Sequence, residues 1–191
     1  MNVQSFSFFF AILALSCWVG AVAILGGAMV RRFGRPDALA EARAQVGRVA
    51  LPLAWAIALV TTLGSLYYSK VQGYVPCELC WYQRICLYPW SVILGIAAWR
   101  RDASIKLYAV PVLCIGIVIS AYHSWIQWFP PTSTSFCTID APCTTKFVNE
   151  FEFVTLPFMA LSAAVFMIAL LLASDPSEND YDPTEEVEVY A

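Results

Sequence analysis

The sequence predicts an all-α integral membrane protein with five membrane-spanning helices, on three observations. Of its 191 residues, 60% are hydrophobic and 13% are charged, and the mean hydropathy of +0.66 is too high for an ordinary soluble domain. Five stretches are apolar and long enough to cross a bilayer core, which needs about 20 helical residues. Basic residues gather beside alternate ends of these stretches, as in membrane proteins with a defined orientation.

The five predicted spans cover residues 6–30, 49–69, 81–99, 107–126 and 153–173, and Arg84 is the only charged residue within them. The first span has no Lys or Arg ahead of it and is unbroken, so we expect a retained helix rather than a cleaved signal peptide. Residues 1–173 are predicted to form a single membrane domain. Residues 174–191 are predicted to form a disordered tail, because seven of the 14 acidic residues lie there.

The positions of Lys and Arg predict the orientation of the spans. The loops after the first and third spans hold eight basic residues: Arg31, Arg32, Arg35, Arg43, Arg48, Arg100, Arg101 and Lys106. The opposite loops hold Lys70 and Lys146, with Arg84 at the membrane boundary. We therefore expect the N-terminus outside the cytoplasm and the C-terminal tail inside. Because the basic residues fit this role, no nucleic-acid partner is predicted.

Four of the seven cysteines lie on the predicted outer side, which is the oxidising one. Cys77 and Cys80 form a CxxC motif at the predicted start of the third helix, and Cys137 and Cys143 lie in the next outer loop. The helix N-terminus and Arg84, four residues after Cys80, both favour a thiolate at Cys80. Three cysteines fall within spans, where we expect small buried apolar side chains: Cys17, Cys86 and Cys114.

The two outer cysteine pairs predict a relay of thiol electrons, and two alternatives compete with it. Structural disulfides that only hold loops together are common outside the cytoplasm, but a CxxC motif at a helix start favours redox chemistry. A four-cysteine zinc site is disfavoured because 56 residues separate Cys80 from Cys137 and 5 residues separate Cys137 from Cys143. No metal is predicted.

Two ionisable residues near the CxxC motif are candidates for ligand binding. Arg84 lies just inside a span, where a charge is costly, and the alternative to a binding role is snorkelling to the lipid headgroups. His123, the only histidine, lies near the outer end of the fourth span, at about the depth of Cys80 and Arg84. A satisfied polar group at a helix end is the alternative for His123.

Four runs resemble the disulfide-bond formation protein B family (DsbB), most closely its Gram-positive branch, BdbC: GSLYYSKVQGYVPCELCWYQR, AYHSWIQ, CTIDAPC and FVTLPFMAL. The resemblance covers about residues 63–172 and leaves out the first span and the tail. It implies a four-helix transmembrane bundle, here with one additional N-terminal transmembrane helix. It also implies a protein-disulfide oxidoreductase of the bacterial cytoplasmic membrane with extracytoplasmic cysteines. Such an enzyme reoxidises a thioredoxin-fold partner of the DsbA or BdbD kind and reduces a quinone, menaquinone or ubiquinone.

The resemblance implies a role for each outer cysteine. Cys137 resembles the cysteine that forms a mixed disulfide with the partner, and Cys143 resembles its resolving mate. Cys77 resembles the cysteine that exchanges with this second pair, and Cys80 resembles the quinone-facing thiolate. Electrons are thus expected to pass from the loop pair to the CxxC pair and then to the quinone, which supports disulfide formation in exported proteins.

Arg84 falls where the family has its quinone-binding arginine, and His123 falls where it has a histidine near the quinone ring.

Two alternative functions stay open. A quinone-linked thiol oxidase of the vitamin K epoxide reductase type also has a CxxC motif and a loop pair, but in the reverse order along the chain. A non-catalytic membrane protein with structural disulfides would consume no thiols when supplied with quinone and a reduced partner.

Overall fold

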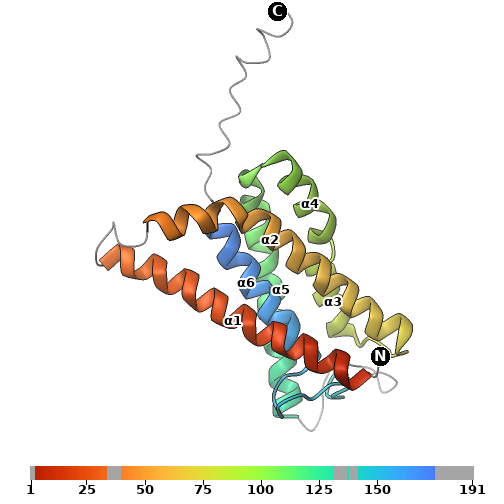
Figure 1. Ribbon diagram of the computed structural model, residues 1–191. Helices are drawn as coiled ribbons and strands as arrows, with labels where there is room; N and C mark the ends of the chain where they lie inside the picture. Colours follow the sequence, from red (N-terminus) through yellow and green to blue (C-terminus); the bar gives the residue numbers. More distant parts are fainter. Residues whose placement is uncertain (1–2, 34–39, 131–136, 138–141, 175–191) are drawn as a thin grey trace, which may run out of the picture.

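The computed structural model describes residues 3–33, 40–130, 137 and 142–174 (Figure 1). A π-helical turn, η1, continues the second helix, and a short 3-10 helix, η2, precedes the fifth. The described residues contain one isolated β-bridge, between Glu150 and Val154, and no strand. The predicted acidic tail, apart from Ser174, lies outside the described residues. The elements are α1 (Val3–Phe33), α2 (Ala40–Leu66), η1 (Tyr67–Val71), α3 (Glu78–Leu87), α4 (Trp90–Arg100), η2 (Ala103–Ile105), α5 (Lys106–Trp128) and α6 (Leu156–Ala173).

Four helical segments are long and apolar enough to cross a membrane: Val3–Val30, Gln45–Val71, Ala103–Trp128 and Leu156–Ala173. They confirm four of the five predicted spans, with ends that differ by a few residues. The last one begins at Leu156 rather than Phe153, because Thr155 is its extended N-cap residue and Val154 pairs with Glu150. Their outer faces are apolar: Val19 is 72% exposed, as expected for a side chain that contacts lipid. The chain is therefore a multi-pass membrane protein.

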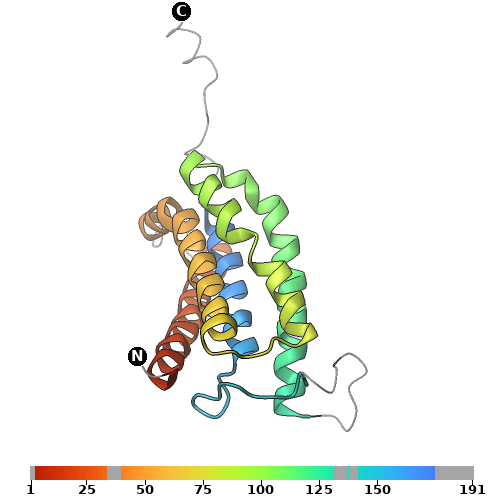
Figure 2. The same cartoon turned by 90° about the vertical axis from the view of Figure 1, so that its right-hand side faces the viewer.

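The third predicted span, residues 81–99, is not one helix. It is divided at Tyr88 and Pro89 into α3 and α4, which Figure 2 shows as separate helices. Pro89 has no backbone N–H to donate, and its ring crowds the preceding turn, so the helical hydrogen bonding stops there. The pattern restarts when the N–H of Ser91 donates to the carbonyl of Tyr88. Pro52 and Pro111, by contrast, lie inside α2 and α5 without dividing them.

The break gives α3 and α4 different neighbours. α3 packs mainly against α5, whereas α4 packs mainly against α2. α6 is the central helix, since it packs against α1, α2 and α5 (Figures 1 and 2). Leu94 of α4, Leu113 of α5 and Met167 of α6 are fully buried in the main apolar core. The result is a helical bundle with α1 added beside α6.

The three cysteines within the spans differ in burial. Cys17 and Cys86 are buried, as predicted, but Cys114 is exposed on the surface of α5. The prediction for Cys114 is wrong because hydropathy does not distinguish a helix face that contacts lipid from one that contacts another helix. Both kinds of face are apolar.

The start of α3, where the CxxC motif lies, is at the same end of the bundle as the start of α1 (Figures 1 and 2), and Cys137 and Cys143 pack against the CxxC pair. The end of α6 and the connection between α4 and α5 lie at the opposite end. This arrangement agrees with the predicted grouping of the cysteines and the N-terminus on one side of the membrane. Which end faces the cytoplasm stays a prediction, based on the distribution of basic residues.

Single-cysteine labelling tests this orientation. In a variant whose seven native cysteines are replaced by serine, Lys146→Cys adds an exposed thiol at the end with the cysteine pairs, and Ser104→Cys adds one at the opposite end. An impermeant maleimide should label Lys146→Cys in intact cells and Ser104→Cys only after permeabilisation. The reverse pattern would contradict the orientation.

Candidate active site

The CxxC motif lies at the start of α3, as predicted. Cys77 is the N-cap residue, with an extended backbone (φ −70°, ψ 173°), and Cys80 lies in the first helical turn. Both are free thiols, and their Sγ atoms are 3.0 Å apart. The backbone N–H groups of a first helical turn have no intrahelical partners, so this position stabilises negative charge on sulfur.

The second pair, Cys137 and Cys143, forms a disulfide with Cα atoms 5.8 Å apart. Cys143 is buried, with 1% of its surface exposed, whereas Cys137 is partly exposed. Cys77 and Cys143 belong to one buried apolar cluster, against which Cys80 and Cys137 also pack. The structure therefore brings the two predicted pairs together, although most of α3 and all of α4 and α5 separate them in the sequence.

His123 of α5 lies between the two pairs. Its Nε2 atom is 3.1 Å from the carbonyl oxygen of Cys143 and 3.7 Å from Sγ of Cys77. Because a carbonyl oxygen only accepts hydrogen bonds, Nε2 carries the hydrogen and is also positioned to donate to the sulfur of Cys77. One turn further on, Gln127 donates to the carbonyl of Thr145 at 3.0 Å and so holds the same loop.

These contacts lower the pKa of Cys77 below its ordinary value. The largest contribution is the hydrogen bond with the Cys80 thiol, and His123 adds to it, while burial of Cys77 acts in the opposite direction. In the reduced pair these hydrogen bonds favour the thiolate at Cys77, so the thiolate predicted at Cys80 stays a prediction. The prediction took account of the helix N-terminus and Arg84. It omitted the competing thiol of Cys77 only 3.0 Å away.

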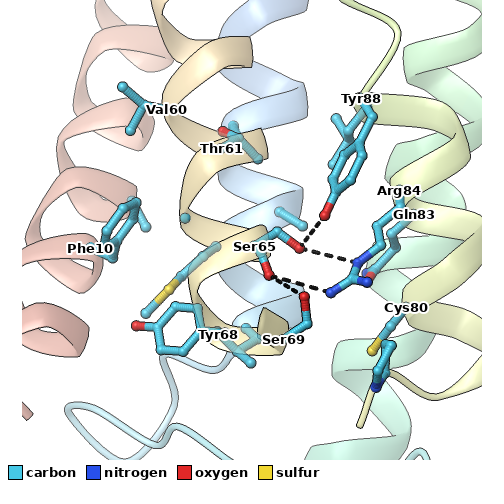
Figure 3. Close-up of a pocket in the computed structure, with 18 of the residues that line it drawn as sticks. Phe10, Val60, Thr61, Ser65, Tyr68, Ser69, Cys80, Gln83, Arg84 and Tyr88 are labelled. Carbon is cyan, nitrogen blue, oxygen red and sulfur yellow. Dashed lines mark hydrogen bonds between the residues drawn. The ribbon is translucent and has the colours of Figure 1, made fainter. Parts of the chain in front are cut away.

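A cavity of about 220 Å³ lies beside Cys80 (Figure 3). Cys80 and Arg84 of α3 line it, whereas Cys77 and His123 do not. α1, α2 and α6 contribute mainly apolar side chains to its walls. The two thiols of one motif thus have different surroundings: Cys77 contacts His123 and the cluster with the loop disulfide, and Cys80 lines the cavity.

Arg84 lines the cavity one helical turn from Cys80, on the predicted face. Its Nε and one terminal nitrogen donate to the hydroxyl and the carbonyl of Ser65, both at 3.3 Å. The guanidinium carbon is 5.2 Å from the Trp81 ring centre and 5.7 Å from that of Tyr88. Within the described part of the chain, no carboxylate pairs with Arg84, and a guanidinium has five N–H donors. Donors are therefore available for a ligand, and the contacts with α2 disfavour simple snorkelling.

His123 does not line the cavity, and the prediction that it lies near a quinone ring stays a prediction. It has the predicted depth, but it projects from α5 on the side of the CxxC motif that contacts the loop disulfide. Depth along a helix does not specify the direction of a side chain.

No sequence pattern singled out Ser65 and Tyr88, although Tyr88 donates to Ser65 at 2.9 Å beside Arg84. The signal in the sequence that could have indicated them is that both are polar residues within apolar spans.

The alternative of a four-cysteine zinc site does not fit this state, because Cys137 and Cys143 are joined by a disulfide. The ligand atoms of Cys77, Cys80 and His123 lie within 4.8 Å of one another, which is close enough to bind a metal ion. A structural zinc site needs four ligands, so this group is incomplete by itself.

Thiol–disulfide exchange requires a thiolate beside a disulfide, and the cluster of Cys77 with the loop pair meets this requirement inside a helical membrane bundle. This combination defines a membrane-embedded thiol–disulfide oxidoreductase. The family model described as "Disulfide bond formation protein DsbB" matches residues 47–174. The chain belongs to the DsbB family, and α1 lies outside the matched region.

Relatives point to the same activity. "Disulfide bond formation protein C" of Bacillus subtilis (strain 168) is 43% identical over 133 residues, which cover 68% of this chain and 96% of that protein. "Probable disulfide formation protein C 2" of Bacillus anthracis is 39% identical over 121 residues, 63% of this chain and 86% of that protein. "Probable disulfide formation protein" of Coxiella burnetii is 40% identical over 124 residues, 64% and 84% of the two chains. These similarities identify a protein-disulfide oxidoreductase of the BdbC branch. No solved structure matches the chain.

Replacement of His123 by phenylalanine tests its hydrogen bond to Cys77. In a background with Cys137→Ser and Cys143→Ser, only the CxxC pair is left at the site. Loss of the imidazole should raise the pKa of Cys77, so the alkylation rate of Cys77 should rise at higher pH than in the His123 protein. A pKa higher by one means that the thiolate has lost about 1.36 kcal/mol of stabilisation.

The matched control is Gln127→Leu, which loses the contact with the loop but leaves Cys77 untouched. Its alkylation curve should coincide with that of the His123 protein. Equal displacement of the curve in both variants would assign the effect to movement of the loop rather than to the imidazole. The measurement is the rate of iodoacetamide modification against pH, with the modified cysteine identified by mass spectrometry.

Proposed function

We propose that this protein oxidises a thioredoxin-fold thiol oxidase of the DsbA or BdbD kind and passes the electrons to a membrane quinone, menaquinone or ubiquinone. One observation carries the proposal: the CxxC motif is divided between two surroundings, with Cys77 beside the loop disulfide and Cys80 beside a cavity that Arg84 lines. The cysteines would face the extracytoplasmic side of the bacterial cytoplasmic membrane, where disulfides form in exported proteins.

The first exchange takes place at the loop disulfide. A thiolate of the reduced partner attacks Cys137, which is the more exposed residue of the two. A mixed disulfide forms with Cys137, and Cys143 leaves as a thiolate. The second thiol of the partner then attacks the partner's own sulfur in the mixed disulfide. The partner leaves oxidised, and Cys137 and Cys143 have gained two electrons.

The second exchange joins the two pairs. The thiolate of Cys143 attacks Cys77 of an oxidised CxxC pair, so a bond between these two sulfurs forms and the bond between Cys77 and Cys80 breaks. Cys80 leaves as a thiolate, which the first turn of α3 and Arg84 stabilise once the competing Cys77 thiol is engaged elsewhere. Cys137 then attacks Cys143, which restores the loop disulfide and releases Cys77.

The cavity beside Cys80 suits the ring of a quinone. Its walls are mainly apolar, and the unpaired N–H groups of Arg84 are donors for a ring carbonyl. Ser65 holds the guanidinium in place through two hydrogen bonds. When bound, the quinone accepts two electrons and two protons, and Cys77 and Cys80 return to a disulfide. The quinone supplies the redox chemistry, while the protein supplies position and charge.

A Cys143→Ser variant tests the order of transfer. The variant has no loop disulfide, so it is given the oxidised partner: the Cys137 thiolate attacks the partner's disulfide, and because no Cys143 thiolate can attack Cys137 and expel the partner, the mixed disulfide should accumulate. Non-reducing electrophoresis detects the complex, and mass spectrometry identifies the joined cysteine. A Cys137→Ser variant should accumulate no such complex. Capture of the partner at Cys77 in the Cys143→Ser protein would reverse the proposed direction.

Quinone titration of the purified protein with reduced partner tests the acceptor. The unaltered protein should consume two thiols for each quinol formed. Arg84→Met should raise the quinone concentration for half-maximal turnover about tenfold to a hundredfold, since a hydrogen bond to a charged group contributes about 1.5–3 kcal/mol. Arg84→Lys should recover part of this loss, because it keeps the charge but not the planar arrangement of donors.

Lys70→Met is the control, since it removes an exposed positive charge near the same end of the bundle without lining the cavity. Its titration should match that of the unaltered protein. If quinone and reduced partner give no loss of thiols, the quinone proposal fails and a non-catalytic or differently coupled protein is favoured. If Arg84→Met alone leaves the titration unchanged, Arg84 does not bind the ring.

A further inference from the structure

The cavity beside Cys80 has a polar end and an apolar end. Gln83 and Arg84 of α3, together with Ser65 of α2, supply polar atoms at one end. Figure 3 shows Phe10 of α1 at the opposite side of the cavity from Cys80. Between these two ends the walls are mainly apolar side chains of α2 and α6. The cavity therefore suits a ligand with a polar ring at one end and a hydrocarbon chain at the other.

α1 forms the apolar end through one face. Its lining residues, here called the α1 stripe, are Phe10, Leu13, Ala14 and Cys17. Steps of three and four residues bring side chains onto the same face of a helix. Val19, on the opposite face, is 72% exposed, as expected for contact with lipid. α1 thus has two apolar faces, one toward the cavity and one toward the bilayer.

Close contacts at two glycines fit α1 against its neighbours. A Cβ atom added to Gly64 of α2 would lie 2.7 Å from the ring of Phe10, and one added to Gly20 of α1 would lie 2.6 Å from the ring of Phe166 of α6. Side chains at these glycines would collide with the rings. α1 therefore packs mainly against α6 and contacts α2 through Phe10.

The size of the cavity limits what it encloses. Its volume of about 220 Å³ is below the roughly 300–1,000 Å³ that is usual for a pocket enclosing a whole drug-sized ligand. A quinone ring and the first part of its tail are a better match than a complete isoprenoid quinone. The remainder of the tail must then leave the bundle at the apolar end, where α1 lies.

We infer that α1 is the tail-binding wall of the quinone site: the ring lies at the α3 end, and the isoprenoid tail runs along the cavity walls from α2 and α6 to the α1 stripe. The inference rests on the proposed quinone-dependent function, and it assigns the binding of the quinone tail to the α1 stripe. The family match covers residues 47–174, so this wall comes from a helix outside the matched region.

Binding of quinones with and without a tail tests the inference. Menadione and menaquinone with a four-isoprenoid tail share one ring, and the ubiquinone ring without a tail and with a two-isoprenoid tail form a second pair. Dissociation constants are measured on the purified full-length protein from quenching of tryptophan fluorescence. Ala14→Phe adds a ring on the α1 stripe, and Val19→Phe makes a comparable enlargement on the lipid face.

Ala14→Phe should raise the dissociation constant of the tail-bearing quinone about tenfold or more, because overpacking excludes the chain, and change that of the tail-less quinone by less than about twofold. Val19→Phe should change neither constant. Single-turnover reduction of the loop disulfide by the reduced partner needs no quinone and shows whether each variant is folded. If Ala14→Phe does not fold, Leu13→Ala decides instead, with an expected loss of about tenfold for the tail-bearing quinone alone.

Two outcomes overturn the inference, and they are distinguishable. If the unaltered protein binds quinone but the folded variant weakens both quinones equally, or neither, then α1 does not bind the tail and the proposed quinone function stands. If the unaltered protein binds neither kind of quinone, the proposed function fails and the inference fails with it.

Discussion

The candidate active site depends on the contact between Cys77 and Cys80. Their sulfur atoms are 3.0 Å apart, yet one residue is the extended N-cap of α3 and the other is already helical. This change of backbone conformation directs one thiol toward α5 and the loop disulfide and leaves the other at the cavity. A motif only four residues long therefore connects two environments, the cluster that contains the loop disulfide and the cavity that Arg84 lines.

The break at Pro89 allows α3 to hold this contact. α3 ends at Leu87 and packs on α5, which carries His123, while α4 continues the span against α2. A continuous helix would have to pack against both α5 and α2 along one straight axis. Because the chain is divided, the orientation of the CxxC motif is set by α5, while the main apolar core is completed by α4.

The sequence was sufficient to predict four spans and the residue types of the site, but not the arrangement of side chains around it. A long apolar run indicates a membrane helix whatever its neighbours are, and reactive residues are few enough in such a chain to be noticed. The direction of a side chain depends on packing, so Cys114 was expected to be buried, and the contacts of His123 with Cys77 and Cys143 were not predicted. Pro89 ends a helix, whereas Pro52 and Pro111 do not, and only their tertiary contexts distinguish them. Likewise, the thiols of Cys77 and Cys80 compete for one proton because their sulfur atoms are 3.0 Å apart. The spacing of the two cysteines in the sequence does not define this distance.

The burial of Cys143 has a consequence for the choice of reductant. A monothiol in water meets the loop disulfide at Cys137 and, on attack, leaves Cys143 as a thiolate enclosed next to its former partner. This enclosed thiolate is held at a high local concentration, so it attacks Cys137 again and expels the monothiol before any electrons move on. A dithiol that is already positioned on the mixed disulfide can complete its own oxidation first. Burial of Cys143 thus keeps the leaving thiolate beside Cys137, so that attack by a single thiol is readily reversed.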